Sequence, residues 1–317
     1  MRNIATNKNI CVYILVLSFA FFSSLLVYAE PSIEEQFASN KQPPIQVTTL
    51  GGYNDDDTRH LYEVNVIRLI LEKTEAQFGP FELKEARGMT HSDSIDIMSG
   101  NKEYPNFVRS FGFTPEMESQ ENLKLIPFPL WRGLLGYRTC FLSDRIVNSF
   151  AAAKTLQELR EFSHGQGTGW IDADILRYND FQVKEVSAYT SLFKMVAKNR
   201  FDLFCRGANE VREEFGRFSY IHGLEYDRSK VFYYPFPHFL FTHADNTALA
   251  ERLEAGAEII VKDGSFEKYW SDYFKNNIRF INFSTRQYVR LENPFMKDFD
   301  LPYEHLIYKP ESAQAQP

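Results

Sequence analysis

The hydrophobic and polar positions of this chain recur with two different periods. Residues 45–50, with the sequence IQVTTL, and residues 81–86, FELKEA, are short runs typical of strands. Between them, Val64, Ile67 and Leu71 recur at the spacing of one helical face. This order of strand, helix and strand predicts a parallel sheet with helices that cross over it.

The first helix has recognisable start and stop signals. Asp57 or Thr58 can cap its first turn, and Gly79-Pro80 ends it. The run SIDIMSG at residues 94–100 follows the second strand and completes a third unit. We expect this run to add another strand to the same sheet.

The middle of the chain repeats this plan. Residues 155–158, TLQE, match a capping box, in which a threonine and a glutamate satisfy backbone amides at the start of a helix. The expected strands are residues 135–142, 181–186 and 201–206, and the expected helices include residues 171–178 and 191–199. The pattern therefore predicts two α/β units of about a hundred residues each.

Aromatic residues dominate two later segments. Residues 231–243, VFYYPFPHFLFTH, contain two prolines and suit a strand that passes from one unit to the other. Helices are expected to begin at Asn246 and Ser265, and the first of them to end at Asp263-Gly264. An aromatic stripe with helical spacing follows, which we interpret as core packing rather than a sugar platform: Phe266, Tyr269, Trp270, Tyr273 and Phe274.

The N-terminus predicts export. Basic Arg2 and Lys8 precede an apolar run from Ile10 to Val27, and Val27-Tyr28-Ala29 then supplies small residues at a cleavage point. Residues 1–29 are therefore expected to be a cleaved signal peptide, with an uncleaved anchor helix as the alternative. Residues 30–44 are polar and contain prolines, as in a mobile leader. Cleavage would release the mature chain outside the cytoplasm.

Charge and cysteine content narrow the function classes. Without residues 1–29, the chain carries 33 basic and 42 acidic side chains. This acidic balance argues against nucleic acid or an anionic membrane surface as the partner. Cys140 and Cys205 are the cysteines of the mature chain, and an oxidising compartment permits a disulfide between them. The alternative is two buried thiols on strands.

A glycine-rich stretch precedes the helix expected at residues 171–178. It reads HGQGTGW and includes Gly167 and Thr168. Backbone amides at a helix N-terminus bind anions, but a phosphate loop would add a lysine that is missing here. The stretch therefore favours a small anion or carboxylate over a nucleotide. The alternative is that the glycines only form a tight turn between strand and helix.

An ordered series of segments resembles one known family. The segments are LYEVNVIRLILEKT, IPFPLWRGLLGYR, LQELREFSHGQGTGWIDADIL, SLFKMVAKNRFDLFCRGANEVREEF, LAERLEAGAEIIVKDGSFEKYW and VRLENP. In this order they resemble type II extracytoplasmic solute-binding proteins of the amino-acid-binding-like class (solute-binding protein family 3). The resemblance implies an α/β fold of two lobes joined by two hinge strands, each lobe a mostly parallel sheet flanked by helices.

The resemblance also implies where the lobes divide. Lobe 1 would comprise residues 45–129 plus 238–305, and lobe 2 residues 134–231. Residues 306–317 would be a tail. The ligand would lie in the cleft between the lobes, which rotate about the hinge to close on it.

The site expected from the resemblance departs from an amino-acid site. Gly167 and Thr168 occupy the place where backbone amides receive the ligand carboxylate. Arg206 occupies the place of the aspartate that accepts the ligand ammonium. Because a guanidinium binds carboxylate, phosphate or sulfate, Arg206 favours an anionic solute. The alternative for Arg206 is an ion pair with Glu210 or another acid.

Further ligand-binding residues are expected around the cleft. They are Tyr53 after the first strand, Ser99 and Tyr104 at the third strand of lobe 1, Trp170 after the glycine turn, and Tyr189 and Thr190 at the next helix of lobe 2. Three consecutive acids at residues 55–57 lack the glycine and distal glutamate of a calcium loop, so we interpret them as cap and surface.

The sequence indicates a receptor rather than an enzyme. No nucleophile elbow, zinc motif or metal cluster is present, so no catalytic residue, metal or cofactor is expected. The expected function is a monomeric periplasmic receptor that binds a small anionic or carboxylate-bearing solute and delivers it to an ABC-type importer. Signalling of ligand occupancy to a membrane sensor partner is the alternative, and an enzyme on the same fold is a third hypothesis.

Overall fold

The computed structural model describes residues 43–54, 57–100, 102–297, 299–300 and 302–311. The expected signal peptide, most of the expected leader and the end of the expected tail lie outside these residues. The first sheet has the order β2-β1-β3-β11-β4. Its strands are β1 (Ile45–Leu50), β2 (Phe81–Ala86), β3 (Phe107–Gly112), β4 (Leu123–Ile126) and β11 (His238–His243).

The second sheet has the order β12-β10-β5-β8-β6-β7, and β9 pairs with β5. Its strands are β5 (Tyr137–Ser143), β6 (His164–Gly167), β7 (Val183–Val186), β8 (Leu203–Gly207), β9 (Leu224–Tyr226), β10 (Lys230–Tyr233) and β12 (Gln287–Arg290). Both sheets are mixed, whereas mostly parallel sheets were expected. The reason is that β11 and β5 enter from the other sheet and run antiparallel to β3 and β8.

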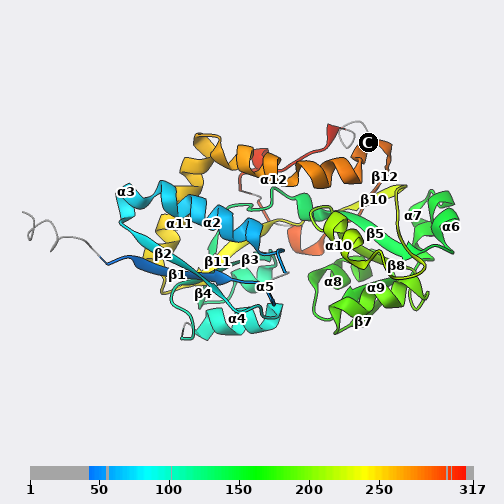
Figure 1. Ribbon diagram of the computed structural model, residues 1–317, viewed down its shortest axis with the longest axis horizontal. Helices are drawn as coiled ribbons and strands as arrows, with labels where there is room; N and C mark the ends of the chain where they lie inside the picture. Colours follow the sequence, from blue (N-terminus) through cyan, green and yellow to red (C-terminus); the bar gives the residue numbers. More distant parts are fainter. Residues whose placement is uncertain (1–42, 55–56, 101, 298, 301, 312–317) are drawn as a thin grey trace, which may run out of the picture. The chain divides into compact units, whose positions relative to one another are not determined.

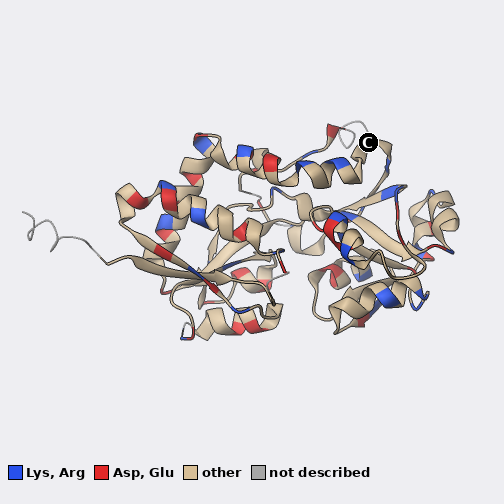
Figure 2. Ribbon diagram, in the orientation of Figure 1, with Lys and Arg blue, Asp and Glu red and all other residues tan. Residues whose placement is uncertain are grey.

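Helices cover the sheets (Figure 1). The helices near the first sheet are α2 (Leu61–Lys73), α3 (Glu75–Phe78), α4 (His91–Gly100), α5 (Pro115–Glu118) and α11 (Thr247–Lys262). Those near the second sheet are α6 (Val147–Ala152), α7 (Leu156–Arg160), α8 (Ile171–Tyr178), α9 (Tyr189–Ala197) and α10 (Val211–Phe218), and α12 (Ser265–Ile281) contacts α10 and α11. Basic and acidic positions are interspersed along α11 and α12 (Figure 2), as expected for solvated helix faces.

The core follows the predicted hydrophobic faces. A large buried cluster begins under α2 and α11 and continues through Trp131 into the second sheet, and a smaller one lies under α4. Three residues of the expected aromatic stripe on α12, Phe266, Trp270 and Phe274, are buried in the large cluster. This supports core packing as the role of the stripe.

Residues 94–100 form part of helix α4 and not the strand that was expected. Thr90 and Asp93 form reciprocal hydrogen bonds between side chains and backbone amides, which fixes the first turn. Ser94 and Met98 are then buried at i, i+4 spacing. The expected strand did not take into account this capping pair, which is the local signal for a helix.

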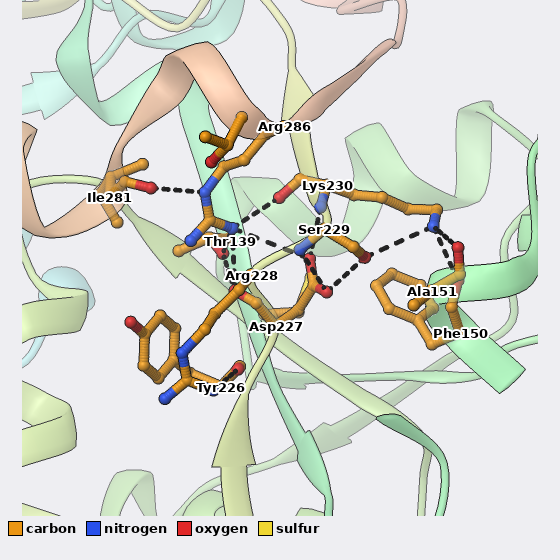
Figure 3. A network of polar contacts seen from close by, with 12 residues as sticks. Thr139, Phe150, Ala151, Tyr226, Asp227, Arg228, Ser229, Lys230, Ile281 and Arg286 are labelled. Carbon is orange, nitrogen blue, oxygen red and sulfur yellow. Dashed lines mark hydrogen bonds and ion pairs between the residues drawn. The ribbon is translucent and has the colours of Figure 1, made fainter. Parts of the chain in front are cut away.

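The C-terminal part of the expected lobe 1 does not all belong to the first sheet. Strand β12 pairs in parallel with β10 of the second sheet. Just before it, buried Arg286 donates hydrogen bonds to the carbonyl oxygens of Ile281, Asp227 and Lys230 and to the Thr139 hydroxyl (Figure 3). These contacts hold the segment against the second sheet, which a sequence pattern could not reveal.

Two short passages join the sheets. The first passage, residues 127–136, leads from β4 to β5, and the second passage, residues 234–237, leads from β10 to β11. Parallel pairing places the carboxyl ends of β1, β2 and β3 at one edge of the first sheet, where β11 begins. In the second sheet, the start of β5 pairs with the end of β10 and with the carboxyl end of β8. Each passage therefore connects the carboxyl edges of both sheets, where ligands bind in open α/β sheets.

Candidate functional site

Arg206 at the end of β8 is engaged by two glutamates. Its Nε donates to both carboxylate oxygens of Glu214 at 3.0 Å, and its Nη2 donates to Glu214 Oε1 at 2.8 Å and to Glu210 Oε1 at 2.6 Å. Arg206 is 5% exposed and Glu214 4% exposed. Tyr189 Oη donates to the same Glu214 carboxylate at 2.7 Å. The ion pair that was the alternative for Arg206 is therefore present.

The electrostatics of this cluster follow from burial and pairing. Burial disfavours charge on Arg206, but Glu210 and Glu214 outweigh it and hold its pKa well above the usual range. Burial raises the pKa of Glu210, which Arg206 opposes and Glu214 reinforces. The two carboxylates compensate the guanidinium, so Arg206 alone is a weak argument for an anionic ligand.

Trp170 covers the cluster and sits against Gly167. The Arg206 guanidinium carbon lies 4.8 Å from the centre of the indole ring, a cation–π contact. A Cβ atom on Gly167 would come within 2.3 Å of Trp170 Cε2. Gly167 is thus required for the close approach of the indole to the end of β6.

Replacing Gly167 with alanine should displace Trp170 and destabilise the protein by about 1–3 kcal/mol, because the added methyl overpacks a filled space. Chemical denaturation and the tryptophan emission maximum would measure both effects. Gly216→Ala is the matched control, since nothing lies within 4 Å of the added methyl on α10. Equal unfolding midpoints for the two variants would contradict this role of Gly167.

The backbone amides after β6 were expected to be free, but they donate to groups of the protein. Thr168 N donates to the Val186 carbonyl at 3.3 Å, and Gly169 N donates to a Glu185 carboxylate oxygen at 3.0 Å. Parallel pairing of β6 with β7 carries this ladder one residue beyond the strand. Thr168 keeps an exposed side chain at the carboxyl edge. Its role as a ligand residue remains a prediction, but its amide cannot supply the expected free donor in this arrangement.

A second ion pair lies where the chain enters β5. Arg138 Nη2 contacts Asp172 Oδ1 at 2.7 Å, and Tyr234 of the second passage also donates to this carboxylate. All three groups are buried. Burial disfavours charge on Arg138, but Asp172 and Tyr234 outweigh it and raise its pKa. The pair fixes the second passage to helix α8.

The loop after β1 contributes a third pair. Arg59 Nε and Nη2 donate to the two Asp57 oxygens at 2.8 and 2.9 Å. The hydrogen bond from Arg59 lowers the pKa of Asp57 to about 2. Asp57 therefore pairs with Arg59 and does not cap α2, whose N-cap position is His60. The Arg59 guanidinium lies 5.0 Å from the ring centre of Tyr189, so residues of the two carboxyl edges touch.

Arg109 differs from these three arginines. Each of Arg59, Arg138 and Arg206 has a carboxylate within 3 Å, whereas no carboxylate among the described residues lies within 4 Å of Arg109. Arg109 extends from β3 and donates to the Thr90 carbonyl at 3.4 Å and to the Ser94 hydroxyl. Burial lowers its pKa, and Glu63 partly opposes that effect.

Glu63 itself is hydrogen-bonded to Ser110 of the first sheet. Its carboxylate accepts hydrogen bonds from the amide and the hydroxyl of Ser110, and Trp131 Nε1 donates to that hydroxyl at 3.1 Å. Burial raises the pKa of Glu63. The sequence pattern could have indicated that Glu63 is buried, because Glu63 shares a helical face with the buried Val66 and Ile67.

The remaining expected residues divide into two groups. Tyr53 is 59% exposed and lines a pocket at the carboxyl edge of the first sheet, together with Gly52, Asp57, His60 and Glu85. Tyr189 and Thr190 begin α9, and Thr190 is exposed.

Ser99 and Tyr104 lie elsewhere. Ser99 lies in the last turn of α4 and Tyr104 in the loop after it, at the opposite edge of the sheet. There the Ser99 carbonyl accepts a hydrogen bond from Asn122, and Tyr104 packs near Phe107 at the start of β3. Their expected place at the cleft was wrong because it depended on residues 94–100 being a strand.

Cys140 and Cys205 are bridged. Cys140 of β5 and Cys205 of β8 face each other across an antiparallel pair and form a disulfide. Buried His164 lies beside it, with Nδ1 3.6 Å from Cys205 Sγ, and burial lowers the His164 pKa to about 3. The bridge ties together two strands that carry Arg138 and Arg206.

Comparison with known proteins identifies the fold. No family model and no curated protein matches the sequence. Among solved structures, the ligand-binding core of GluR0 in complex with L-glutamate matches with a TM-score of 0.54 and 11% identity, covering 73% of this chain and 98% of that chain. A Salmonella typhimurium periplasmic binding protein with high arginine specificity matches with a TM-score of 0.53 and 11% identity, covering 74% and 100% of the two chains. The chain has the two-lobe fold of periplasmic binding proteins.

A third match is a binding protein whose description relates it to an enzyme. It is an ancestral amino-acid-binding protein described as a precursor of cyclohexadienyl dehydratase, with a TM-score of 0.51 and 10% identity over 76% of this chain and 98% of that chain. At such identities the likeness establishes the fold and not the ligand. The expected fold class is confirmed. In the described part of the chain, every helix is too short or too polar to span a bilayer.

Proposed function

We propose that this chain is an extracytoplasmic solute-binding receptor. In this proposal it binds one small carboxylate-bearing solute between the carboxyl edges of its two sheets and presents it to an ABC-type importer. The fold and the two passages support hinge closure around a ligand, as in other two-lobe proteins. The proposed location in the periplasm rests on residues 1–29, whose composition is that of an export signal.

The observation that carries the proposal is that Arg109 has no carboxylate partner among the described residues. It projects from β3 toward Thr90, at the start of α4, where Arg59 and Tyr53 also contribute to the local electrostatics. A half-buried arginine without a carboxylate partner in the described structure is a natural anchor for an incoming carboxylate, since the fork geometry allows two hydrogen bonds. Arg206, Arg138 and Arg59 are less suitable because each is already paired.

The first experiment is a thermal-shift screen of the purified mature chain against carboxylates, amino acids and small anions. A ligand that binds the folded state should raise the melting temperature in a concentration-dependent way. The best compound would then be titrated by calorimetry and recovered for mass spectrometry. Recovery of the unchanged compound is expected of a receptor, whereas conversion to a product would favour an enzyme on this fold.

The role of Arg109 predicts a large effect of one substitution. Arg109→Ala should weaken the carboxylate hit by about 2 kcal/mol, or about 30-fold in Kd, because a charged hydrogen-bonded contact is lost. Arg87→Ala is the matched control, since Arg87 is an exposed arginine just after β2 at the same edge. Equal affinities of the Arg109→Ala variant and the parent chain would exclude Arg109 as the anchor.

A further inference from the structure

His238 lies where the two passages between the sheets meet. It is the first residue of β11 and pairs with Gly112 of β3. Its carbonyl accepts a hydrogen bond from Leu130 of the first passage at 3.1 Å, and the neighbouring Pro237 carbonyl accepts one from Phe113 at 3.0 Å. Any rotation of one sheet against the other must move the chain next to His238.

The His238 side chain is half-buried among aromatic and basic groups. Its ring packs edge-on against Phe236, with ring centres 4.8 Å apart. The guanidinium of Arg138, from the second sheet, lies 5.3 Å from the centre of the same Phe236 ring. His238 Nε2 is buried and has no hydrogen-bond partner among the described residues. Among the described residues, a proton on Nε2 would therefore have no hydrogen-bond acceptor to stabilise it.

Other bases face this point from the first sheet. His91 at the start of α4 and Arg109 of β3 both pack on Phe111, at 4.9 and 5.1 Å from its ring centre. Three charged or titratable groups act on His238: Arg138 from β5, Arg109 from β3 and His91 from α4. Asp172 is paired with Arg138, and Glu63 is bound to Ser110. Within the described residues, no carboxylate forms an ion pair with His238 or His91.

We propose that His238 and His91 make the hinge acid-sensitive: their protonation adds positive charge between Arg109 and Arg138 and drives the carboxyl edges of the two sheets apart. Acidification would then favour release of whatever the protein binds. The inference depends on the fold and on these contacts and requires no ligand, so its failure would leave the proposed receptor role untouched.

The sign of the effect follows from proton linkage. Burial, with help from Arg109, lowers the pKa of His91 to about 4, and burial with Arg138, His91 and Arg109 holds the pKa of His238 well below its usual value. Separation of the edges would return both pKa values toward 6.5. The separated form therefore binds more protons, and the packed form loses its advantage as pH falls from about 6.5 toward about 4.

The test is small-angle X-ray scattering of the purified chain between about pH 7.5 and about pH 4.5, the range in which an imidazole of ordinary pKa gains its proton. The radius of gyration should increase reversibly as the pH falls below about 6.5. In the double variant H91Q/H238Q, whose side chains stay neutral, the increase should be absent in this window. The variant His222→Gln removes an exposed histidine and should behave like the parent chain.

An unchanged radius in the parent chain, or the same increase in H91Q/H238Q, would overturn the proposal. Because the double variant could fail to fold, histidine NMR of the parent chain supplies a second criterion. The His238 ring resonance should shift only together with the scattering transition. Titration of His238 near pH 6.5 at constant radius of gyration would show that its charge is not coupled to the hinge.

Discussion

Replacing Arg206 with methionine should destabilise the protein by about 3–5 kcal/mol, the cost of leaving buried charge without its partner. The guanidinium donates four hydrogen bonds of 2.6–3.0 Å to Glu210 and Glu214. Without it, Glu214 would retain the hydrogen bond from Tyr189 but would carry an unpaired buried charge. The shift of the urea unfolding midpoint, followed by circular dichroism, measures this loss.

The double variant R206M/E214M is the matched control for this prediction. It removes Glu214, the more buried of the two carboxylates, together with the guanidinium, and apolar replacement of a buried pair is often close to neutral. The double variant should therefore recover much of the stability that R206M loses. A single variant that unfolds at the same urea concentration as the parent would contradict the structural role of Arg206 and restore it as a candidate ligand anchor.

Removing the Cys140–Cys205 disulfide should have an effect of similar size. The bridge closes a chain separation of 65 residues, and its loss in C140A/C205A frees the unfolded chain. The entropy of closing a loop of this length corresponds to about 4 kcal/mol of stability. Urea unfolding of the variant and of the parent chain, both without reductant, measures the difference.

Treatment of the unfolded parent chain with reductant provides an independent check on the bridge. The parent should lose stability when it is refolded under reducing conditions, whereas C140A/C205A should respond little, because no bridge remains to be reduced. Equal unfolding midpoints of the variant and the oxidised parent would show that the bridge does not constrain the unfolded chain as expected.

The local pattern predicted many elements closely. Strands β1 and β2 and helix α8 have the predicted bounds, and the predicted capping box at Thr155 and Glu158 has both of its hydrogen bonds. These elements depend on neighbours within about four residues, so the sequence contains the required information. The run at residues 231–243 was also predicted correctly as a connection, since β10 and β11 belong to different sheets.

The candidate site was predicted less well. The lack of an available Thr168 amide results from the register of β6 against β7, and the burial of Arg206 results from helix α10, which brings Glu214 to it. Glu214 is not visible from the residue pattern of β8. Ser99 and Tyr104 were misplaced by one wrong secondary-structure assignment, because a helix in place of a strand reverses the direction in which the chain runs.

The sequence by itself determined the α/β alternation, the connection of two units through residues 231–243 and the resemblance that implied a two-lobe fold. These follow from periodicity and from ordered similarity along the chain. Only the tertiary structure decided which charges are already neutralised. The partners of Arg138 and Glu63 are 34 and 47 positions away, and such pairs form only after the topology has brought separate elements together. The choice of Arg109 as the anchor therefore depends on folding and not on local sequence.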